Sequence, residues 1–317
     1  MEAVVARENG QTSISKTPLV SIIVPNYNHA RFLEQRLESI FQQSVQDFEV
    51  ILLDDASTDS SLEILRKYKE NYEQVTHLIV NQFNTASPFQ QWEKGIQLAA
   101  GKYIWIAESD DWAAPTFIEK LLPLVQQKGV SLAFCNSYWV DEKSKSKKSL
   151  SIHNHSFLKD GQKEIGEHLV YHNSIQNVSS VLFKKTYLEQ RNLNYTELSI
   201  AGDWILYVDL LLKSKFAFLE DKLNYFRWYH NNVSNQTYEK GIWTKEGIEV
   251  LDLIGNQVHL KKGKLFFVAK RWITKILSFI KRTGDVKSAV KMFGILFNFL
   301  WKQLTKKQVQ DSLLLSY

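Results

Sequence analysis

Short, nearly continuous apolar runs alternate with amphipathic segments along the first half of the chain. The apolar runs are LVSIIVP, FEVILL, THLIV, KYIWIA and VSLAFC, and the segments between them are 31–43, 62–72, 92–99 and 117–127. Such runs are typical of buried parallel strands, and the segments between them have the length and apolar spacing of helices. The pattern therefore predicts an α/β core, with a mostly parallel sheet and helices on both faces.

The order of elements changes after a charged loop at 141–149. The sequence predicts a strand at 176–183, a helix at 202–213 that begins near Asp203, and one or two further strands up to residue 230. From about residue 240 the chain becomes helical and aromatic. We therefore expect a flexible leader at 1–17, an α/β domain at 18–240 with halves at 18–140 and 150–240, and a helical C-terminal region at 241–317.

Composition narrows the class of protein. The chain has 317 residues, of which 44% are hydrophobic and 23% charged, so it can bury a globular core. Its single cysteine, Cys135, cannot form an intramolecular disulfide, which favours a reducing compartment. The first 17 residues have no apolar stretch typical of a secretory signal. The uncharged apolar stretch at 292–301 is about half of the roughly 20 residues that cross a bilayer. We therefore expect a cytoplasmic protein.

Positive charge is concentrated near the C-terminus. The net charge is +5, with 39 Lys or Arg against 34 Asp or Glu. Residues 261–317 hold 13 Lys or Arg and 2 Asp, a net charge of +11, which leaves 26 basic and 32 acidic residues, a net charge of −6, in residues 1–260. This division indicates that the C-terminal region meets a polyanion, either a membrane surface or nucleic acid.

Apolar residues in the same region recur at helical spacing. One set is Leu265, Val268, Trp272, Ile276, Phe279 and Ile280, and another is Phe293, Phe297, Phe299 and Trp301. They predict either helices packed on the α/β domain or an anchor in anionic lipid, where each nearby basic residue contributes about 1 kcal/mol.

Polar residues follow three of the predicted strands directly. The segments are Pro25-Asn26-Tyr27-Asn28, Asp54-Asp55-Ala56-Ser57 and Glu108-Ser109-Asp110-Asp111-Trp112. In open parallel sheets, ligands bind beyond the carboxyl ends of the strands, so these acids are expected at one crevice. Clustered acids repel one another unless a bound cation or a ligand that donates hydrogen bonds offsets their charge. Carboxylate oxygens are suitable ligands for Mg²⁺ or Mn²⁺, and substrate phosphates usually complete the shell of such an ion. Alternatively, Asp54 and Asp55 only cap the following helix.

Taken together and in this order, the three segments resemble the family 2 glycosyltransferases of the GT-A fold. The resemblance is strong over residues 18–140 and weaker to about residue 235. It implies a Rossmann-like nucleotide-sugar domain, Mn²⁺ or Mg²⁺, a nucleoside diphosphate sugar donor of the UDP type, and inversion at the transferred sugar. It also implies a glycan or lipid-linked glycan acceptor and a part in cell-surface polysaccharide synthesis.

The resemblance also implies roles for residues near the donor. Pro25 and Tyr27 match the loop that packs on the nucleobase, and Asp55 matches the residue that binds a uracil-type base. Asp110 is expected near the ribose and Asp111 on the metal ion. Glu108 stands where many members have Asp.

Residues further along the chain match the acceptor side of the family pattern. Asp203 corresponds to the general base that takes the acceptor proton, with Gly202 in place of the usual preceding acid. An N-terminal cap of the helix is the alternative role for Asp203, and Asp209 is expected to be structural. The run at 84–95 resembles a family variant with SPFxQW, in which we expect Phe89 to lie in the core.

The segment at 225–234 resembles the strand and loop that end in R-x-H-x-N-N-x-S. Arg227 is the expected diphosphate partner, because its guanidinium fork matches phosphate oxygens. His230, one place late in this register, is the expected metal or diphosphate ligand, and Tyr229 takes the usual histidine position.

Other functions fit the sequence less well. A non-catalytic nucleotide- or glycan-binding protein of the same fold would not need the acids and Asp203. A receiver domain leaves the second acidic motif unexplained, and a dehydrogenase would need G-x-G-x-x-G after the first strand, which is absent. For the basic C-terminal region, a lipid-linked acceptor favours the inner face of the cell membrane as the partner, and no nucleic acid is expected.

Overall fold

The computed structural model describes residues 17–143, 145–149, 151–229, 237 and 240–305. The strands are β1 Val20–Asn26, β2 Phe48–Asp54, β3 Val75–Val80, β4 Tyr103–Ile106, β5 Trp112–Ala113, β6 Val130–Val140, β7 Ser146–Ser149, β8 Phe157–Asp160, β9 Val181–Lys184 and β10 Lys215–Arg227. The α-helices of the first half are α1 Ala30–Phe41, α2 Ser61–Asn71, α3 Pro88–Leu98 and α4 Phe117–Val125. Those that follow are α5 Gly161–Glu164, α6 Lys185–Glu189, α7 Gly202–Leu211, α9 Ile242–Gln257, α10 Lys262–Thr283 and α11 Val286–Thr305. A π-helical turn spans Ile165–Leu169 and a 3₁₀ turn spans Val178–Ser180.

The strands form one mixed sheet in the order β3-β2-β1-β4-β9-β6-β10-β5, with β7 added to β6 and β8 to β10. Strands β1 to β4 pair in parallel, as do β6 and β10, whereas β9 is antiparallel to both of its neighbours. Strands from the two predicted halves, 18–140 and 150–240, therefore belong to the same sheet.

The predicted strand at 176–183 is wrong in its first part. The backbone makes a 3₁₀ turn at Val178–Ser180, and only then begins β9. Side-chain bonds explain the difference, because Asn177 donates to Asp111 and the Ser179 hydroxyl accepts from the Glu108 amide. The carbonyl of Ser179 also accepts from the Trp105 indole at 2.8 Å. A turn here brings Asn177 and Ser179 within hydrogen-bond distance of Asp111 and Glu108, which follow β4.

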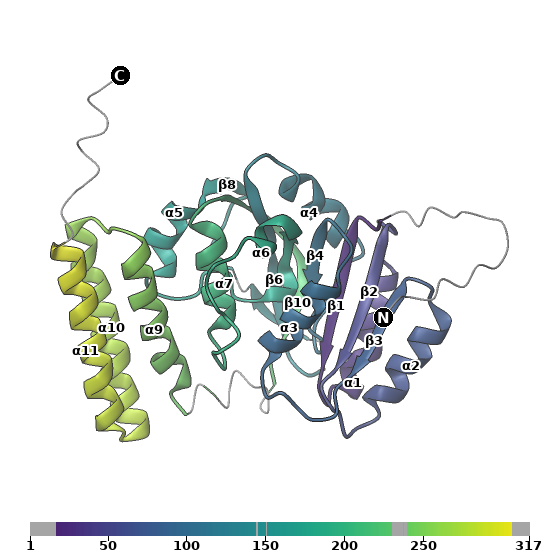
Figure 1. The fold of residues 1–317 in the computed structure, drawn as a ribbon, viewed down its shortest axis with the longest axis horizontal. Coiled ribbons are helices and arrows are strands. Elements are labelled where there is room, and N and C mark those ends of the chain that lie inside the picture. Colours follow the sequence, from purple (N-terminus) through teal and green to yellow (C-terminus); the bar gives the residue numbers. More distant parts are fainter. Residues whose placement is uncertain (1–16, 144, 150, 230–236, 238–239, 306–317) are drawn as a thin grey trace, which may run out of the picture.

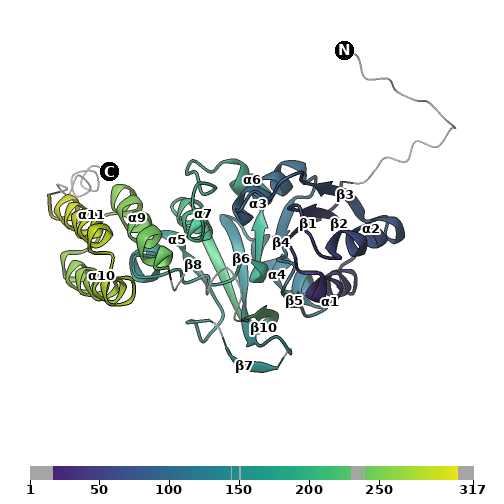
Figure 2. The same cartoon turned by 90° about the horizontal axis from the view of Figure 1, so that it is seen from below.

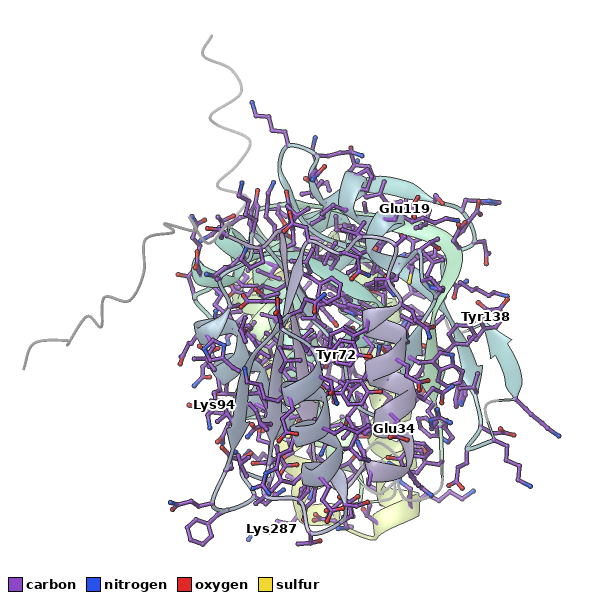
Figure 3. All side chains as sticks on the ribbon, turned by 90° about the vertical axis from the view of Figure 1, so that its right-hand side faces the viewer. Glu34, Tyr72, Lys94, Glu119, Tyr138 and Lys287 are labelled. Atoms are coloured by element: carbon purple, nitrogen blue, oxygen red, sulfur yellow. The ribbon has the colours of Figure 1, made fainter. Side chains whose placement is uncertain are left out.

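The two faces of the sheet bury different helices. Val20, Ile22 and Val24 of β1 pack with residues of α1, α2 and α4, whereas Ile23 faces α3 and α7. This alternation within an almost wholly apolar strand is what helices on both faces require. Seen from the β1–β3 end, Glu34 on α1 and Tyr72 after α2 face the viewer, with Lys94 of α3 and Tyr138 of β6 on opposite sides (Figure 3).

The C-terminal helices pack at the end of the molecule opposite β1–β3 (Figures 1 and 2). Leu265, Val268, Trp272, Ile276 and Phe279 of α10 are all buried and belong to the same hydrophobic cluster as α3 and α7. These five residues of the first apolar set therefore lie in the core, as expected of helices packed on the α/β domain, and membrane binding by the region stays a prediction. In the described residues no helix is long and apolar enough to cross a membrane.

Candidate active site

The acidic loop, Glu108 to Asp111, leaves the carboxyl end of β4 in the middle of the sheet. Arg36 of α1 contacts this loop, and its guanidinium Nε donates to the Glu108 carbonyl at 2.8 Å. Burial lowers the pKa of Arg36 to about 10, and the charges of Asp111 and Asp110 oppose that shift. Arg36 therefore lies as a buried cation beneath a cluster of carboxylates.

Asp111 lies inside the protein. Only 2% of its surface is exposed. Its Oδ1 accepts from the Arg227 backbone amide and its Oδ2 from the Asn177 side chain, both at 2.9 Å. Burial, followed by the charge of Asp110, raises the pKa of the Asp111 carboxyl to about 6. The carboxylate thus ties the acidic loop to β10 and to the turn before β9.

Asp110 is half-buried, and its Oδ2 accepts from the Tyr229 hydroxyl at 3.1 Å. The same hydroxyl lies 3.0 Å from Nε2 of His29, whose Nδ1 lies 2.8 Å from the Ser109 hydroxyl. The result is a chain of polar groups from the β1–α1 loop to Asp110. The sequence offered one weak sign of His29, a polar residue directly after the Pro25–Asn28 segment.

Arg227 points into the structure. Its side chain is 2% exposed and donates to the Asp110 carbonyl at 2.8 Å, the Glu142 carbonyl at 3.1 Å and Gln35 Oε1 at 2.7 Å. The guanidinium also lies 4.2 Å from the centre of the Phe32 ring. Burial lowers its pKa. These contacts join Arg227 to the acidic loop, and its contact with a diphosphate stays a prediction.

Glu108 is bound by an aromatic residue of α3. Trp92 Nε1 donates to its Oε1 at 2.6 Å. Burial, followed by the charge of Asp110, raises the pKa of Glu108 to about 8. The run at 84–95 therefore reaches the acidic loop, and Phe89 within it is 3% exposed, in the core as expected.

The residues predicted to bind the nucleobase lie at the ends of β1 and β2. The Tyr27 ring is 44% exposed and open to a ligand, whereas Pro25 is buried within β1. Asp55 is 5% exposed, and its carboxylate accepts from Asn81, Thr85 and Gln91 at 2.6 to 3.0 Å. In this arrangement, Asp55 holds the loop between β3 and α3.

Asp203 is the second residue of α7. Its Oδ2 accepts from Asn173 Nδ2 at 2.8 Å, and its Oδ1 from the Trp204 amide at 2.6 Å. Burial raises its pKa to about 7, against the effect of these two hydrogen bonds. A carboxylate with a pKa near neutrality suits general base catalysis. Asp209, on the same helix, accepts from the amides of Asn192 and Leu193 and so has the structural role expected.

Two segments connect Asp203 with the acidic loop. The segment that leads into the turn before β9 carries Asn173, which donates to Asp203, and Asn177, which donates to Asp111. Helix α3 carries Trp92, on Glu108, and Phe89, which lies against Gly202. Both connections join the acidic loop after β4 to the start of α7.

Gly202 has no room for a side chain. A Cβ there would lie 2.4 Å from the Tyr195 carbonyl oxygen and 2.7 Å from Cδ2 of Phe89. An acid at this position, as in the family pattern, would collide with the backbone before Asp203. The position of the Phe89 ring on α3 therefore requires a glycine at residue 202.

The carboxylates of the acidic loop include a suitable ligand for a hard divalent ion. Such an ion needs one or two protein carboxylates and completes its shell with water and phosphate oxygens. Asp110 is a half-buried carboxylate of this kind. Within the part of the chain that the structure describes, no group of three or more His, Cys, Asp or Glu residues is arranged as a complete metal site. His230, the predicted second ligand, lies outside the described residues.

Comparison with known proteins identifies the class. The description of glycosyl transferase family 2 matches residues 21–191, and the chain belongs to that family. It is a glycosyltransferase with the GT-A fold and C-terminal helices, as the sequence predicted.

Among individual proteins, glycosyltransferase GlyG of Streptococcus pneumoniae is 28% identical over 246 residues, 73% of this chain and 78% of GlyG. The putative teichuronic acid biosynthesis glycosyltransferase TuaG of Bacillus subtilis is 31% identical over 117 residues, 37% of this chain and 46% of TuaG.

Two solved structures are similar in fold. Residues 1–349 of S. aureus TarS in complex with UDP-GlcNAc align with a TM-score of 0.68 and 16% identity, covering 89% of this chain and 81% of that one. The mannosyltransferase PcManGT of Pyrobaculum calidifontis, in complex with GDP-Man and Mn²⁺, aligns with a TM-score of 0.54 and 13% identity, covering 92% of this chain and 89% of that one. At these identities the likeness concerns the fold.

Proposed function

We propose that the protein is a metal-dependent, inverting glycosyltransferase that uses a nucleoside diphosphate sugar of the UDP type. The acceptor is a hydroxyl of a glycan or lipid-linked glycan, in the synthesis of a cell-surface polysaccharide. One observation carries the proposal: Asn173 and Asn177, four residues apart in one segment, donate to Asp203 and to Asp111 of the acidic loop. A base and a donor-binding acid cluster at a fixed separation are what sugar transfer requires.

The comparisons support the donor class. The TarS structure holds UDP-GlcNAc and PcManGT holds GDP-Man, so proteins of this fold bind nucleoside diphosphate sugars. The exposed Tyr27 ring would stack on the base. Asp55 would bind the base edge, and the base would then share or replace one of the donors from Asn81, Thr85 and Gln91.

For the metal ion, the burial of the acids favours Asp110 over Asp111. Asp110 is partly open, whereas both oxygens of Asp111 accept bonds from inside the protein. We therefore assign the ion to Asp110 and give Asp111 and Arg227 the task of shaping the loop. When bound, a divalent ion would offset the charge of the leaving diphosphate. His230 stays a predicted ligand.

Asp203 would act on the acceptor. Its carboxylate takes the proton of the acceptor hydroxyl as that oxygen attacks the anomeric carbon of the donor sugar. The new glycosidic bond forms as the bond from the anomeric carbon to the diphosphate oxygen breaks, and the nucleoside diphosphate leaves with that electron pair. Attack opposite the leaving group inverts the anomeric centre.

A donor screen tests this function. UDP- and GDP-sugars are incubated with the protein, Mn²⁺ or Mg²⁺ and candidate acceptors, and release of nucleoside diphosphate is measured beside the thermal shift caused by each donor. We expect at least one UDP-sugar to stabilise the protein and to be turned over, and Asp203→Asn to keep the shift but lose turnover. Donor binding without turnover under any condition would instead support the non-catalytic binding protein.

We also propose that the protein works on an anionic membrane surface. Helix α11 exposes Val286, Val290, Phe297, Trp301 and Leu304, whose spacing places them on one side of the helix. A further exposed set lies on α10, namely Phe266, Phe267, Ile273 and Leu277. These residues differ from the α10 set that packs in the core.

Charge decides between lipid and a second copy of the chain. Exposed Lys287 and Lys291 directly follow Val286 and Val290, two members of the exposed apolar stripe on α11 described above. The net charge of residues 261–317 is +11. Two such faces in a symmetric dimer would bring lysines of like charge together, whereas anionic headgroups complement them.

Sedimentation with vesicles of phosphatidylcholine and phosphatidylglycerol at low salt tests the membrane proposal. We expect the full-length protein to sediment with the vesicles, and Phe297→Ser with Trp301→Ser to remain in solution. Leu158→Ser, at an exposed position on β8, is the matched control and should sediment like wild type. The proposal fails if the wild-type protein does not sediment with the vesicles, or if the serine substitutions convert a dimer to a monomer without changing sedimentation with vesicles.

A further inference from the structure

A carboxylate from the C-terminal helices holds the loop that precedes Asp203. Glu246 of α9 accepts from the backbone amides of Ser199, Ile200 and Ala201, at 2.8, 2.9 and 2.9 Å. Both carboxylate oxygens take part, and the side chain is 9% exposed. These three amides are consecutive and end directly before Gly202, so the anchor lies two residues from the proposed base.

The geometry around this anchor leaves the loop little freedom. Gly202 is packed against the Tyr195 carbonyl and Phe89 on its other side, as described above. On α9, a Cβ at Gly247 would lie 2.9 Å from the Trp272 ring and 3.2 Å from the Trp204 ring, so the helix approaches α7 closely at the residue after Glu246. Trp204 itself follows Asp203 in the chain.

The indole of Trp204 is fixed in turn. Its Nε1 donates to the Leu169 carbonyl at 3.0 Å, and its ring stacks with that of Trp272, with centroids 6.4 Å apart. The start of α7 is thus held from both directions, by Glu246 before Asp203 and by the tryptophan pair after it. Neither contact touches the acidic loop.

We propose that Glu246 is a positioning residue for sugar transfer, which sets the position of the Asp203 carboxylate through the three amides of residues 199–201. The inference rests on the proposed role of Asp203 as the base. It makes α9 part of the catalytic apparatus rather than an appendage to it. A charged acceptor with three short bonds to a loop is a strong restraint, because hydrogen bonds to ionised groups are shorter and stronger than neutral ones.

Glu246 also acts on the base through its charge. After burial, which is the largest cause, the negative charge of Glu246 contributes to raising the pKa of Asp203 to about 7. Tyr207, one turn along α7, also interacts with Asp203, and it stays neutral because burial raises its own pKa well above the usual value. Loss of the Glu246 charge should therefore lower the pKa of Asp203.

The test compares Glu246→Gln, Glu246→Asp and Glu249→Gln in the full-length protein. In Glu246→Gln, the glutamine NH₂ group faces backbone N–H groups and cannot accept their hydrogen bonds. We therefore expect kcat to fall by roughly 10- to 100-fold, the range for a displaced catalytic group. The KM for the nucleotide sugar should change little. The acid limb of the kcat profile should also move to lower pH. Glu246→Asp keeps the charge but shortens the reach, so it should lower kcat without moving the limb.

Glu249→Gln is the matched control, because it removes an exposed carboxylate three residues along the same helix. It should leave kcat and the acid limb unchanged. If Glu246→Gln has wild-type kcat and an unmoved limb while Asp203→Asn is inactive, the positioning role is wrong and the base assignment stands. If Asp203→Asn is itself fully active, the proposed function fails first. Thermal unfolding of each variant shows whether it is folded, and Glu246→Asp provides the test if Glu246→Gln is not.

Discussion

Two adjacent aspartates after β4 lie in opposite surroundings. Asp111 is buried between β10 and the turn before β9, with one donor on each oxygen, while Asp110 is half-buried and accepts from Tyr229. The chain of contacts from His29 through Tyr229 to Asp110 suits a carboxylate that must be oriented yet remain open on one side. Position in the motif alone does not separate these two acids, whereas burial does.

Alanine at each position should therefore have different effects. Asp111→Ala leaves the Arg227 amide and Asn177 without their acceptor, which should lower the free energy of unfolding by about 1–3 kcal/mol. Asp110→Ala should leave stability close to wild type but abolish the response of turnover to Mn²⁺. Urea denaturation and a Mn²⁺ titration of nucleoside diphosphate release measure the two effects. A stable Asp111→Ala protein without Mn²⁺ response would return the metal role to Asp111.

The pKa of Asp203 makes stability depend on pH. Burial raises it from 3.8 to about 7, so between these values the folded protein binds a proton that the unfolded chain releases. Stability from this group is therefore full below about pH 4 and is lost as the pH rises to about 7. Asp203→Asn removes the loss, so at pH 8 it should be more stable than wild type by about 1–4 kcal/mol, and at pH 4 by much less. Equal stabilities at pH 8 would show that the carboxylate ionises freely in the folded protein.

At the scale of elements, the sequence predicts best where burial alone decides the structure. Strands β1, β2 and β4 are nearly unbroken apolar runs because helices cover both faces of the sheet there, whereas the edge strand β3 is only partly buried. The short strands β5 and β8 have too few residues to show a period, and the turn at 178–180 depends on bonds that Asn177 and Ser179 make to a loop about 70 residues away.

The same distinction applies to the site. Residue types after strands indicated Asp55 and Asp110, because the carboxyl edge of a parallel sheet collects such groups. Asp203 was indicated instead by the family resemblance, at the start of a helix. Trp92 and Glu246 carry no such sign, since their polar partners lie 16 and 45 or more residues away and only packing brings them together. Arg227 was found by its place in the family pattern, and its partners include the Asp110 carbonyl, the Glu142 carbonyl and Gln35.

The junction between α3 and α7 predicts the cost of restoring a side chain at position 202. In Gly202→Ala, the new Cβ meets the Tyr195 carbonyl, which belongs to the backbone and cannot rotate away. We expect a loss of about 1–3 kcal/mol in the free energy of unfolding, typical of overpacking, and a fall in kcat as Asp203 shifts.

Gly263→Ala is the control, because nothing lies within 4 Å of a Cβ at that position of α10. It should be neutral or stabilising by up to about 1 kcal/mol. Urea denaturation followed by tryptophan fluorescence compares the two variants. Equal stability of the two would mean that the backbone before Asp203 yields easily, which would also weaken the case for a rigid base.

At the scale of the whole molecule, the C-terminal helices α9 to α11 have two different sides. Their inner side belongs to the same hydrophobic cluster as α3, α7 and the sheet, and Glu246 connects that side to the base loop. Their outer side carries the exposed apolar stripe and the lysines. A protein that meets its acceptor at a membrane would thereby carry its docking surface and the residue that positions its base, Glu246, on one group of helices.

This arrangement changes what a truncation should do. Deletion of residues 261–317 removes Leu265, Trp272 and Phe279, which are buried in the shared cluster, together with the bond from Trp272 to the Val170 carbonyl. The remaining chain would expose the apolar surface of α7 and α9, so we expect a lower unfolding midpoint, aggregation and loss of turnover. The full-length protein with Phe297→Ser and Trp301→Ser is the comparison, since it changes only exposed positions and should unfold near the wild-type midpoint. Thermal unfolding by circular dichroism, with donor binding measured beside it, distinguishes the two. A truncated protein that unfolds at the wild-type midpoint and still turns over donor would make the helices a separable appendage, in which case Glu246 could not depend on their packing.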